Sequence, residues 1–277
     1  LITRPDFVAC HNPAYIGRYD MLSTIRDGGT FLLNSPYKSE EVFDHLSEDM
    51  QRAIIDKKLK FYNINALEIA HDVGLGNRIN TVMQAAFFKI SGVLPEDEAI
   101  KLIKKAIQKT FARKGDDIVK MNWECVDRTS DALEEVSVPA SITKSAEVKA
   151  IIPENAGDFA RDVIEPVIRL KGDDVPVSKM SFDGVIPVGT TALEKRGIAP
   201  QVPCWLSENC IQCNQCTFSC PHAVIRAKQV DPKDLENAPD GFETVKSKTK
   251  NERDLEYRLQ VYIEDCTGCG VCIATCP

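Results

Sequence analysis

The stretch "ENCIQCNQCTFSCPHA", residues 208–223, holds four cysteines and a proline within twelve residues. Its spacing, C-x2-C-x2-C-x3-C-P, returns at residues 266–277 as "CTGCGVCIATCP". Eight of the eleven cysteines therefore lie in two short groups. An odd number of cysteines grouped in this way is a poor disulfide framework, and in a long chain it indicates metal ligation in a reducing compartment.

Each group begins with three cysteines at two-residue intervals, a spacing that lets a short loop bind three irons of one cubane cluster. The fourth iron then needs a thiolate from elsewhere in the chain. A structural zinc site is the alternative, because zinc also binds four thiolates from C-x2-C pairs. Zinc ribbons use paired cysteines, however, and two triplets would leave thiolates over. The spacing therefore favours two [4Fe-4S] clusters.

The duplicated motif resembles that of two-cluster ferredoxins, in which the fourth cysteine of each motif binds the cluster of the other. This resemblance implies two ligand sets. Cluster one would be bound by Cys210, Cys213, Cys216 and Cys276, and cluster two by Cys266, Cys269, Cys272 and Cys220. Gly268 and Gly270 would bring backbone amides close to cluster two, whereas the first motif carries Gln212 and Asn214. We therefore expect the two reduction potentials to differ.

The three other cysteines, Cys10, Cys125 and Cys204, are predicted to be structural thiols because all eight ligand places are filled. Cys10 precedes His11, but adjacent side chains of a strand point to opposite faces, which disfavours a nucleophilic pair. We predict no catalytic residue and no residue that binds an organic cofactor within this chain.

Residues 1–138 alternate between strand-like and helix-like patterns, which predicts an α/β domain. Strands are expected at residues 29–35 and 60–66, and helices at 39–59, 77–91 and 95–115. The glycines of "HDVGLGNRIN", residues 71–80, favour a plain turn before a helix. A phosphate site at that helix start, beside Arg78, is the alternative.

The remainder of the chain divides into a loop-rich module and an α+β segment that carries the cysteines. Prolines, glycines and short apolar pieces fill residues 139–196. Residues 197–277 carry both cysteine motifs, separated by the insert 222–265. Alternating apolar residues near the end of the insert, from Tyr257 to Ile263, predict a strand that leads into the second motif.

Composition limits the classes of function. The net charge of −7 disfavours nucleic acid as a partner. Because the chain has neither a run of eighteen apolar residues nor a secretory signal, we expect a cytoplasmic protein that does not enter a membrane. The chain opens with Leu1 and stops at Pro277, so we expect it to be part of a longer polypeptide.

Several further stretches resemble the central part of the pyruvate:ferredoxin (flavodoxin) oxidoreductase family, also called pyruvate synthases. They are "LITRPDFVACHNPAYIGRYD", "GLGNRINTVMQAAFF", "GTTALEKRGIAP" and "CIQCNQCTFSCPHAVIRA", and the resemblance runs along nearly all of the chain. It implies three parts: the C-terminal part of a gamma-type 2-oxoacid oxidoreductase domain (1–138), a small EKR-type domain (139–196), and a two-cluster ferredoxin-like domain (197–277).

The resemblance also implies an oxidoreductase that converts pyruvate and coenzyme A to acetyl-CoA and CO2 and reduces ferredoxin or flavodoxin. Thiamine diphosphate, magnesium and a third [4Fe-4S] cluster would belong to parts outside this chain, which lacks a GDG motif. The whole enzyme is expected to be a homodimer. The alternatives are a non-enzymatic polyferredoxin-type subunit, or a variant of the same family that is fused to a flavin domain and reduces NADP.

Overall fold

The computed structural model describes residues 2–146, 150–249 and 254–277, and the chain forms two compact units, Leu1–Val188 and Gly189–Pro277. The domain boundary predicted at 138/139 lies within the first unit, and the one predicted at 196/197 lies within the second. The three-part division stays a prediction. Among the described residues, no helix has both the length and the hydrophobicity needed to cross a bilayer.

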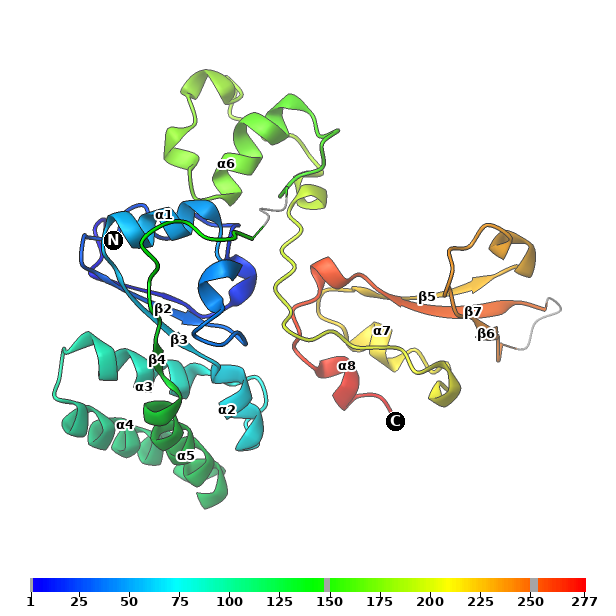
Figure 1. Ribbon diagram of the computed structural model, residues 1–277. Helices are drawn as coiled ribbons and strands as arrows, with labels where there is room; N and C mark the ends of the chain where they lie inside the picture. The colour runs from blue at the N-terminus through cyan, green and yellow to red at the C-terminus, as the bar shows by residue number, and fades with distance from the viewer. Residues whose placement is uncertain (1, 147–149, 250–253) are drawn as a thin grey trace. The chain divides into compact units, whose positions relative to one another are not determined.

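The first unit is built on a mixed sheet, which confirms the predicted α/β class (Figure 1). Its strand order is β1 (Phe7–Cys10), β2 (Thr30–Asn34), β3 (Lys60–Ile64) and β4 (Glu134–Glu135). The first three strands are parallel, and β4 pairs antiparallel with β3. The strands predicted at 29–35 and 60–66 are therefore confirmed as β2 and β3.

Alternating side chains of the strands enter two separate cores, one on each face of the sheet. Phe31 and Phe61 stack with ring centroids 5.3 Å apart and pack toward α1 (Glu48–Asp56). Leu32 and Ile64 point the other way, toward the helices α2 (Ala66–Asp72), α3 (Asn80–Ser91) and α5 (Asp116–Ala132). The helix α4 (Glu96–Phe111) packs outside α3 and α5.

The predicted helix 39–59 is wrong at its start. A short 3-10 turn, Val42–His45, is followed by extended backbone at Leu46, and α1 begins only at Glu48. Ser47 caps α1, since its Oγ accepts a hydrogen bond from the backbone N–H of Met50 at 3.4 Å. Apolar periodicity did not reveal the break, because the turn and the helix bury the same face.

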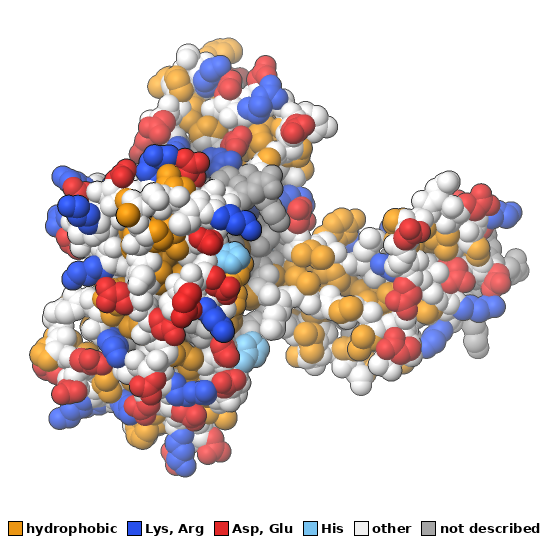
Figure 2. Space-filling view, viewed as in Figure 1, with side chains coloured by type: hydrophobic (Ala, Val, Ile, Leu, Met, Phe, Trp, Pro, Cys, Tyr) orange, Lys and Arg blue, Asp and Glu red, His pale blue; other side chains and the backbone are white. Residues whose placement is uncertain are grey.

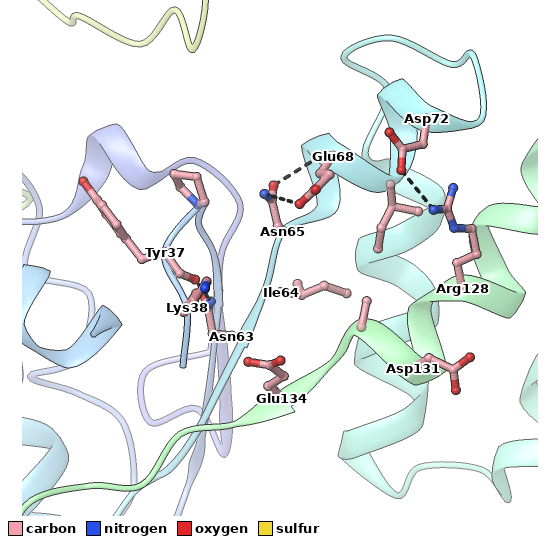
Figure 3. Close-up of a pocket in the computed structure, with 13 residues that line it drawn as sticks. Tyr37, Lys38, Asn63, Ile64, Asn65, Glu68, Asp72, Arg128, Asp131 and Glu134 are labelled. Carbon is pink, nitrogen blue, oxygen red and sulfur yellow. Dashed lines mark hydrogen bonds and ion pairs between the residues drawn. The ribbon is translucent and has the colours of Figure 1, made fainter. Parts of the chain in front are cut away.

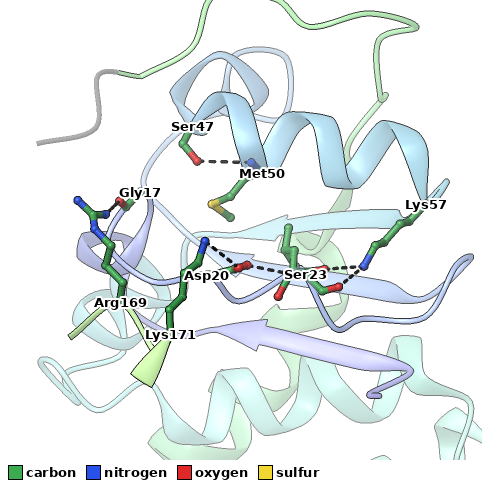
Figure 4. Close-up of polar contacts among 9 residues, drawn as sticks. Gly17, Asp20, Ser23, Ser47, Met50, Lys57, Arg169 and Lys171 are labelled. Atoms are coloured by element: carbon green, nitrogen blue, oxygen red, sulfur yellow. Dashed lines mark hydrogen bonds and ion pairs between the residues drawn. The ribbon is translucent and has the colours of Figure 1, made fainter. Parts of the chain in front are cut away.

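Residues 150–188 form short helical turns, including α6 (Glu165–Ile168), and are loop-rich as predicted. Polar contacts attach them to the α/β part of the same unit (Figure 4). Arg169 donates to the carbonyl of Gly17 at 3.5 Å, and Lys171 pairs with Asp20 at 3.5 Å. Beside them, the Lys57 ammonium donates to three carbonyls of the loop 22–25, which fixes that loop against α1.

The second unit is a three-stranded antiparallel sheet with two short helices (Figure 1). The strand order is β5 (Ile225–Val230), β7 (Glu256–Val261) and β6 (Val245–Lys246), and the helices are α7 (Gln215–Ser219) and α8 (Val271–Ala274). The strand predicted before the second motif is confirmed as β7, whose Tyr257 and Leu259 are buried in the core of the unit.

Candidate functional site

A cavity of about 560 Å³ in the second unit is surrounded by cysteines of both motifs. Its cysteine lining consists of Cys204, Cys210, Cys213, Cys216, Cys272 and Cys276. The apolar side chains of Ile225, Leu259 and Val261 form part of its wall. The fold thus brings Cys276 to the same space as the first three cysteines of the first motif, which is the set expected for cluster one.

The two motif loops have the same backbone turns although their residues differ. Gln212 and Asn214 have φ values of 60°, and Gly268 and Gly270, at the equivalent places of the second loop, have φ values of 69° and 75°. A left-handed conformation costs a residue with a side chain roughly 1–2 kcal/mol. In the first loop, side-chain hydrogen bonds offset this cost.

These hydrogen bonds join the first loop to the sheet and to the insert. The buried Tyr257 donates its hydroxyl to Oδ1 of Asn214 at 2.8 Å. Gln212 donates its amide to the carbonyl of Lys246 at 2.9 Å, and its Oε1 accepts from the backbone N–H of Lys248 at 2.8 Å. The first loop is therefore held by side chains in conformations that the second loop reaches with glycine.

The second loop is packed against the segment that precedes the first motif. A Cβ atom on Gly268 would lie 3.2 Å from the carbonyl oxygen of Gln201, so a side chain here would require that carbonyl to shift by a few tenths of an ångström. Lys195 pairs with Asp265, the residue before Cys266, at 2.5 Å, while the backbone N–H of Gly197 donates to the carbonyl of Glu264 at 2.9 Å. The "EKR" stretch thus anchors the start of the second motif, a role that the sequence pattern did not predict.

The fourth cysteine of each motif lies beside the other motif. Burial raises the pKa of Cys272, and the nearby thiols of Cys269 and Cys220 raise it further. The residues just before the fourth cysteine of each motif also meet, since the hydroxyls of Ser219 and Thr275 lie 2.9 Å apart. These contacts agree with the exchange of ligands between motifs, and the assignment of all eight ligands remains a prediction.

The cysteines surround a cavity and do not converge on the position of a single metal ion. No three histidine, cysteine or carboxylate side chains in the described parts of the chain lie close enough to hold one metal ion. Trp205, which lines the cavity, has a buried indole N–H without a hydrogen-bond partner among the described residues. Thiols spread around the cavity and an orphan N–H donor both suit a cluster whose sulfurs accept hydrogen bonds.

Side chains near the motifs are mostly apolar at the surface. Figure 2 shows hydrophobic side chains gathered over the α7 and α8 end of this unit, with charged ones toward the β6 end. Phe218 and Ile273, on these two helices, are 88% and 68% exposed. Each of them lies within three residues of two predicted ligands.

The remaining cysteines differ in their surroundings. Cys10 and Cys125 are buried, and burial raises the pKa of each thiol to about 11. The Cys10 thiol also donates to the carbonyl of Asn12 at 3.1 Å. Cys204 is exposed and lies at the cysteine-lined cavity. The first two therefore have the character of structural thiols, whereas Cys204 is accessible.

Alkylation should separate these thiols. In the native protein under anaerobic conditions, we expect iodoacetamide at pH 8 to modify Cys204 while Cys10 and Cys125 resist, because a thiol with a pKa of about 11 is only ~0.1% thiolate at that pH. Any slow labelling of the buried pair should rise about tenfold per pH unit below pH 11. Mass spectrometry of the modified peptides measures this, with the unfolded protein as the fully labelled control. Labelling of Cys10 as fast as that of Cys204 would contradict the prediction.

A second cavity, of about 490 Å³, lies in the first unit at the carboxyl ends of β2 and β3 (Figure 3). Arg128 on its wall is paired with Asp72 at 2.9 Å, and Asn65 donates to Glu68 at 2.9 Å. Its other charged lining residues are Lys38, Asp131 and Glu134. Carboxylates outnumber cations, so this cavity offers no cradle for a phosphate. Its polar lining residues Asn65, Glu68 and Asp72 are separated by apolar ones, so no continuous run in the sequence points to this cavity.

The glycine-containing stretch 71–80 forms the turn between α2 and α3. Gly74 and Gly76 have φ values of 85° and 59°, and α3 begins at Asn80. His71 Nε2 lies 3.0 Å from Oδ1 of Asn77, so these two polar groups are engaged with each other. The turn has the form that the plain interpretation predicts.

Three family models match successive parts of the chain. Residues 1–132 match "Pyruvate ferredoxin/flavodoxin oxidoreductase", residues 145–199 match EKR, a domain of unknown function, and residues 206–277 match "4Fe-4S dicluster domain". An oxidoreductase-type model thus matches within the α/β unit, and an iron-sulfur dicluster model matches within the second unit.

Similar proteins align with the whole of the chain. It is 52% identical to the pyruvate:ferredoxin oxidoreductase of Moorella thermoacetica and 42% identical to the probable pyruvate-flavodoxin oxidoreductase of Escherichia coli, covering 24% of each. It is also 42% identical to the mitochondrial pyruvate dehydrogenase [NADP(+)] of Euglena gracilis, of which it covers 15%. The chain is thus similar over its whole length to pyruvate:ferredoxin and pyruvate-flavodoxin oxidoreductases, and it spans about a quarter of the length of the first relatives that it matches.

Proposed function

We propose that this chain relays electrons through two [4Fe-4S] clusters within an enzyme that oxidises pyruvate. The observation that carries the proposal is the cavity that gathers Cys276 with Cys210, Cys213 and Cys216. The similarity over the whole chain, including the α/β unit, supports an enzyme over a polyferredoxin-type subunit.

The proposed reaction of the whole protein is pyruvate + coenzyme A + two oxidised ferredoxins → acetyl-CoA + CO2 + two reduced ferredoxins + H⁺. Thiamine diphosphate, magnesium and a third cluster would be held by other parts of a cytoplasmic homodimer. Flavodoxin is the other proposed acceptor. The relatives named as NADP(+) enzymes favour, as a second candidate, a fused enzyme that passes the same electrons to NADP.

In this relay the chain's own residues would bind the clusters, exclude water from them and donate hydrogen bonds to sulfur. Cluster one would be held by Cys210, Cys213, Cys216 and Cys276, and cluster two by Cys266, Cys269, Cys272 and Cys220. A [4Fe-4S] cluster supplies one-electron chemistry at a potential set by charge, hydrogen bonds and solvent exposure. Ile225 and Leu259 keep water from one wall of the cavity, and the backbone N–H of Gly268 donates to the sulfur of Cys266 at 3.4 Å.

Replacing Cys213 tests the proposal. In the whole protein, purified anaerobically, Cys213→Ala is expected to lose the iron of one cluster and to cut electron delivery to ferredoxin by about 10–100-fold. Release of the first CO2 from pyruvate, measured in a single turnover, should be largely retained, because that step belongs to other domains and precedes electron delivery. Iron analysis and EPR spectra measure the first effect, with Cys204→Ala as a matched control. Full retention of iron in Cys213→Ala would reject the proposed site.

A further inference from the structure

The insert between the two motifs makes charged contact with the first loop. The Lys248 ammonium donates to the carbonyl oxygen of Cys210 at 3.0 Å. The backbone N–H of the same residue donates to Gln212, whose amide in turn donates to the carbonyl of Lys246. Residues 246–248 are thus bound to the first loop at its first predicted ligand, Cys210, and at Gln212 just before the second one, and they bring a positive charge with them.

The second loop has a different charge environment. The residue before its first predicted ligand is Asp265, whereas the equivalent residue of the first loop is the uncharged Asn209. Asp265 forms an ion pair with Lys195 at 2.5 Å, which brings a cation to the start of the second loop. At the start of the second loop, the charge of Lys195 is therefore neutralised by Asp265. At the first loop, the ammonium of Lys248 contacts a neutral carbonyl.

This difference acts on the reduction potentials. Reduction adds negative charge to a cluster, so a nearby positive charge stabilises the reduced form and raises the potential. The N–H to sulfur hydrogen bond of Gly268 acts in the same sense on cluster two. It is a neutral interaction, however, and is weaker than one that involves a full charge. The balance of these contacts favours reduction of cluster one.

We propose that Lys248 positions the first loop and gives cluster one, the cluster of Cys210, Cys213, Cys216 and Cys276, the higher reduction potential of the two. An electron in the relay then resides on cluster one more often than on cluster two. The inference rests on the cluster sites proposed above, and it assigns to the insert a role in setting the direction of electron flow.

Lys248→Met in the whole anaerobic protein tests this inference through EPR-monitored redox titration. We expect the higher midpoint to fall so that the electron-sharing equilibrium between the clusters changes at least about threefold, which is about 28 mV at about 59 mV per tenfold. The lower midpoint should stay. The higher midpoint is assigned to cluster one by its absence from Cys213→Ala. Lys248→Arg, which keeps the charge, should restore the wild-type value.

Lys246→Met is the matched control. It removes a lysine of the same segment whose ammonium is exposed and paired with Asp254 at 2.9 Å, and it keeps the backbone carbonyl that Gln212 binds. Both midpoints should stay at their wild-type values in this variant. Equal shifts in Lys246→Met and Lys248→Met, or no shift in either, would overturn the inference.

The salt dependence of the midpoint potentials tests the inference independently of the variants, and the iron content of the wild-type protein tests the proposed function. Because Lys248 is exposed, raising the salt from about 0.05 to about 0.5 M should move the higher midpoint of the wild-type protein toward the lower one. This measurement still decides the inference if Lys248→Met fails to assemble its clusters, and a salt-independent gap would reject it. Absence of both clusters from the wild-type protein would instead reject the proposed function.

Discussion

Cys220→Ala is expected to remove the same cluster as Cys269→Ala, although Cys220 belongs to the first motif. The reason is the proposed exchange of ligands: Cys220 lies near Cys272, and Cys276 lies at the cavity of the first motif. In the whole protein this substitution should remove about half of the iron of the two clusters and lower electron delivery to ferredoxin by about 10–100-fold.

EPR spectra of single-cysteine variants provide the measurement. The spectrum of reduced Cys220→Ala should match that of Cys269→Ala, and the spectrum of Cys276→Ala should match that of Cys213→Ala. Cys204→Ala, which alters a thiol at the same cavity without a proposed ligand role, should keep both signals. A Cys220→Ala spectrum identical to that of Cys213→Ala would show that each motif binds its own cluster.

Gly268→Ala should destabilise the second unit by about 2–4 kcal/mol in its free energy of unfolding. Two costs add at this position. A φ of 69° is unfavourable for any residue with a Cβ, and that Cβ would press on the carbonyl oxygen of Gln201 at 3.2 Å and on the Cβ of Ala199 at 3.4 Å. Thermal loss of the cluster absorbance in the anaerobic protein measures the effect.

Gly270 provides the matched control for this prediction. Its φ is 75°, but a Cβ there would meet no atom within 4 Å. Gly270→Ala should therefore cost only the conformational term, about 1–2 kcal/mol. Gly270→Asn should cost less, because asparagine tolerates this conformation, as Asn214 does at the equivalent place of the first loop. Equal losses for the two alanine variants would show that the contact with Gln201 is unimportant.

Local patterns in the sequence predicted the strands β2, β3 and β7 and the two loops that carry the cysteines. These features depend on residues close together in the chain, so period and spacing report them. The proposed exchange of Cys220 and Cys276 between the clusters depends on the way the chain returns on itself after the insert. It was supplied by resemblance to two-cluster ferredoxins and not by spacing.

Other features had no local signal. The break before α1 was missed because Val42, Phe43 and Leu46 are buried whether they belong to a turn or to a helix. Glycines marked the left-handed positions of the second loop, whereas Gln212 in the first loop is held in that conformation by bonds to residues more than thirty positions away.

Long-range polar contacts were equally hidden. The pair of Lys195 and Asp265 joins residues seventy positions apart, and nothing in either neighbourhood indicates the other. The cavity at the ends of β2 and β3 depends on α5 as well as on the strands. Such sites form only when separate elements pack together, so they became visible in the structure alone.

The contact between Ser219 and Thr275 has a consequence for the arrangement of the two motifs. These two residues occupy the same place in their motifs, one before the fourth cysteine, and they contact each other. In a two-fold symmetric dimer, a residue beside the axis meets its own copy in this way. The two motifs thus meet at equivalent residues, as two copies do beside a symmetry axis, and under the proposed exchange of ligands neither motif alone supplies four thiolates to one cluster.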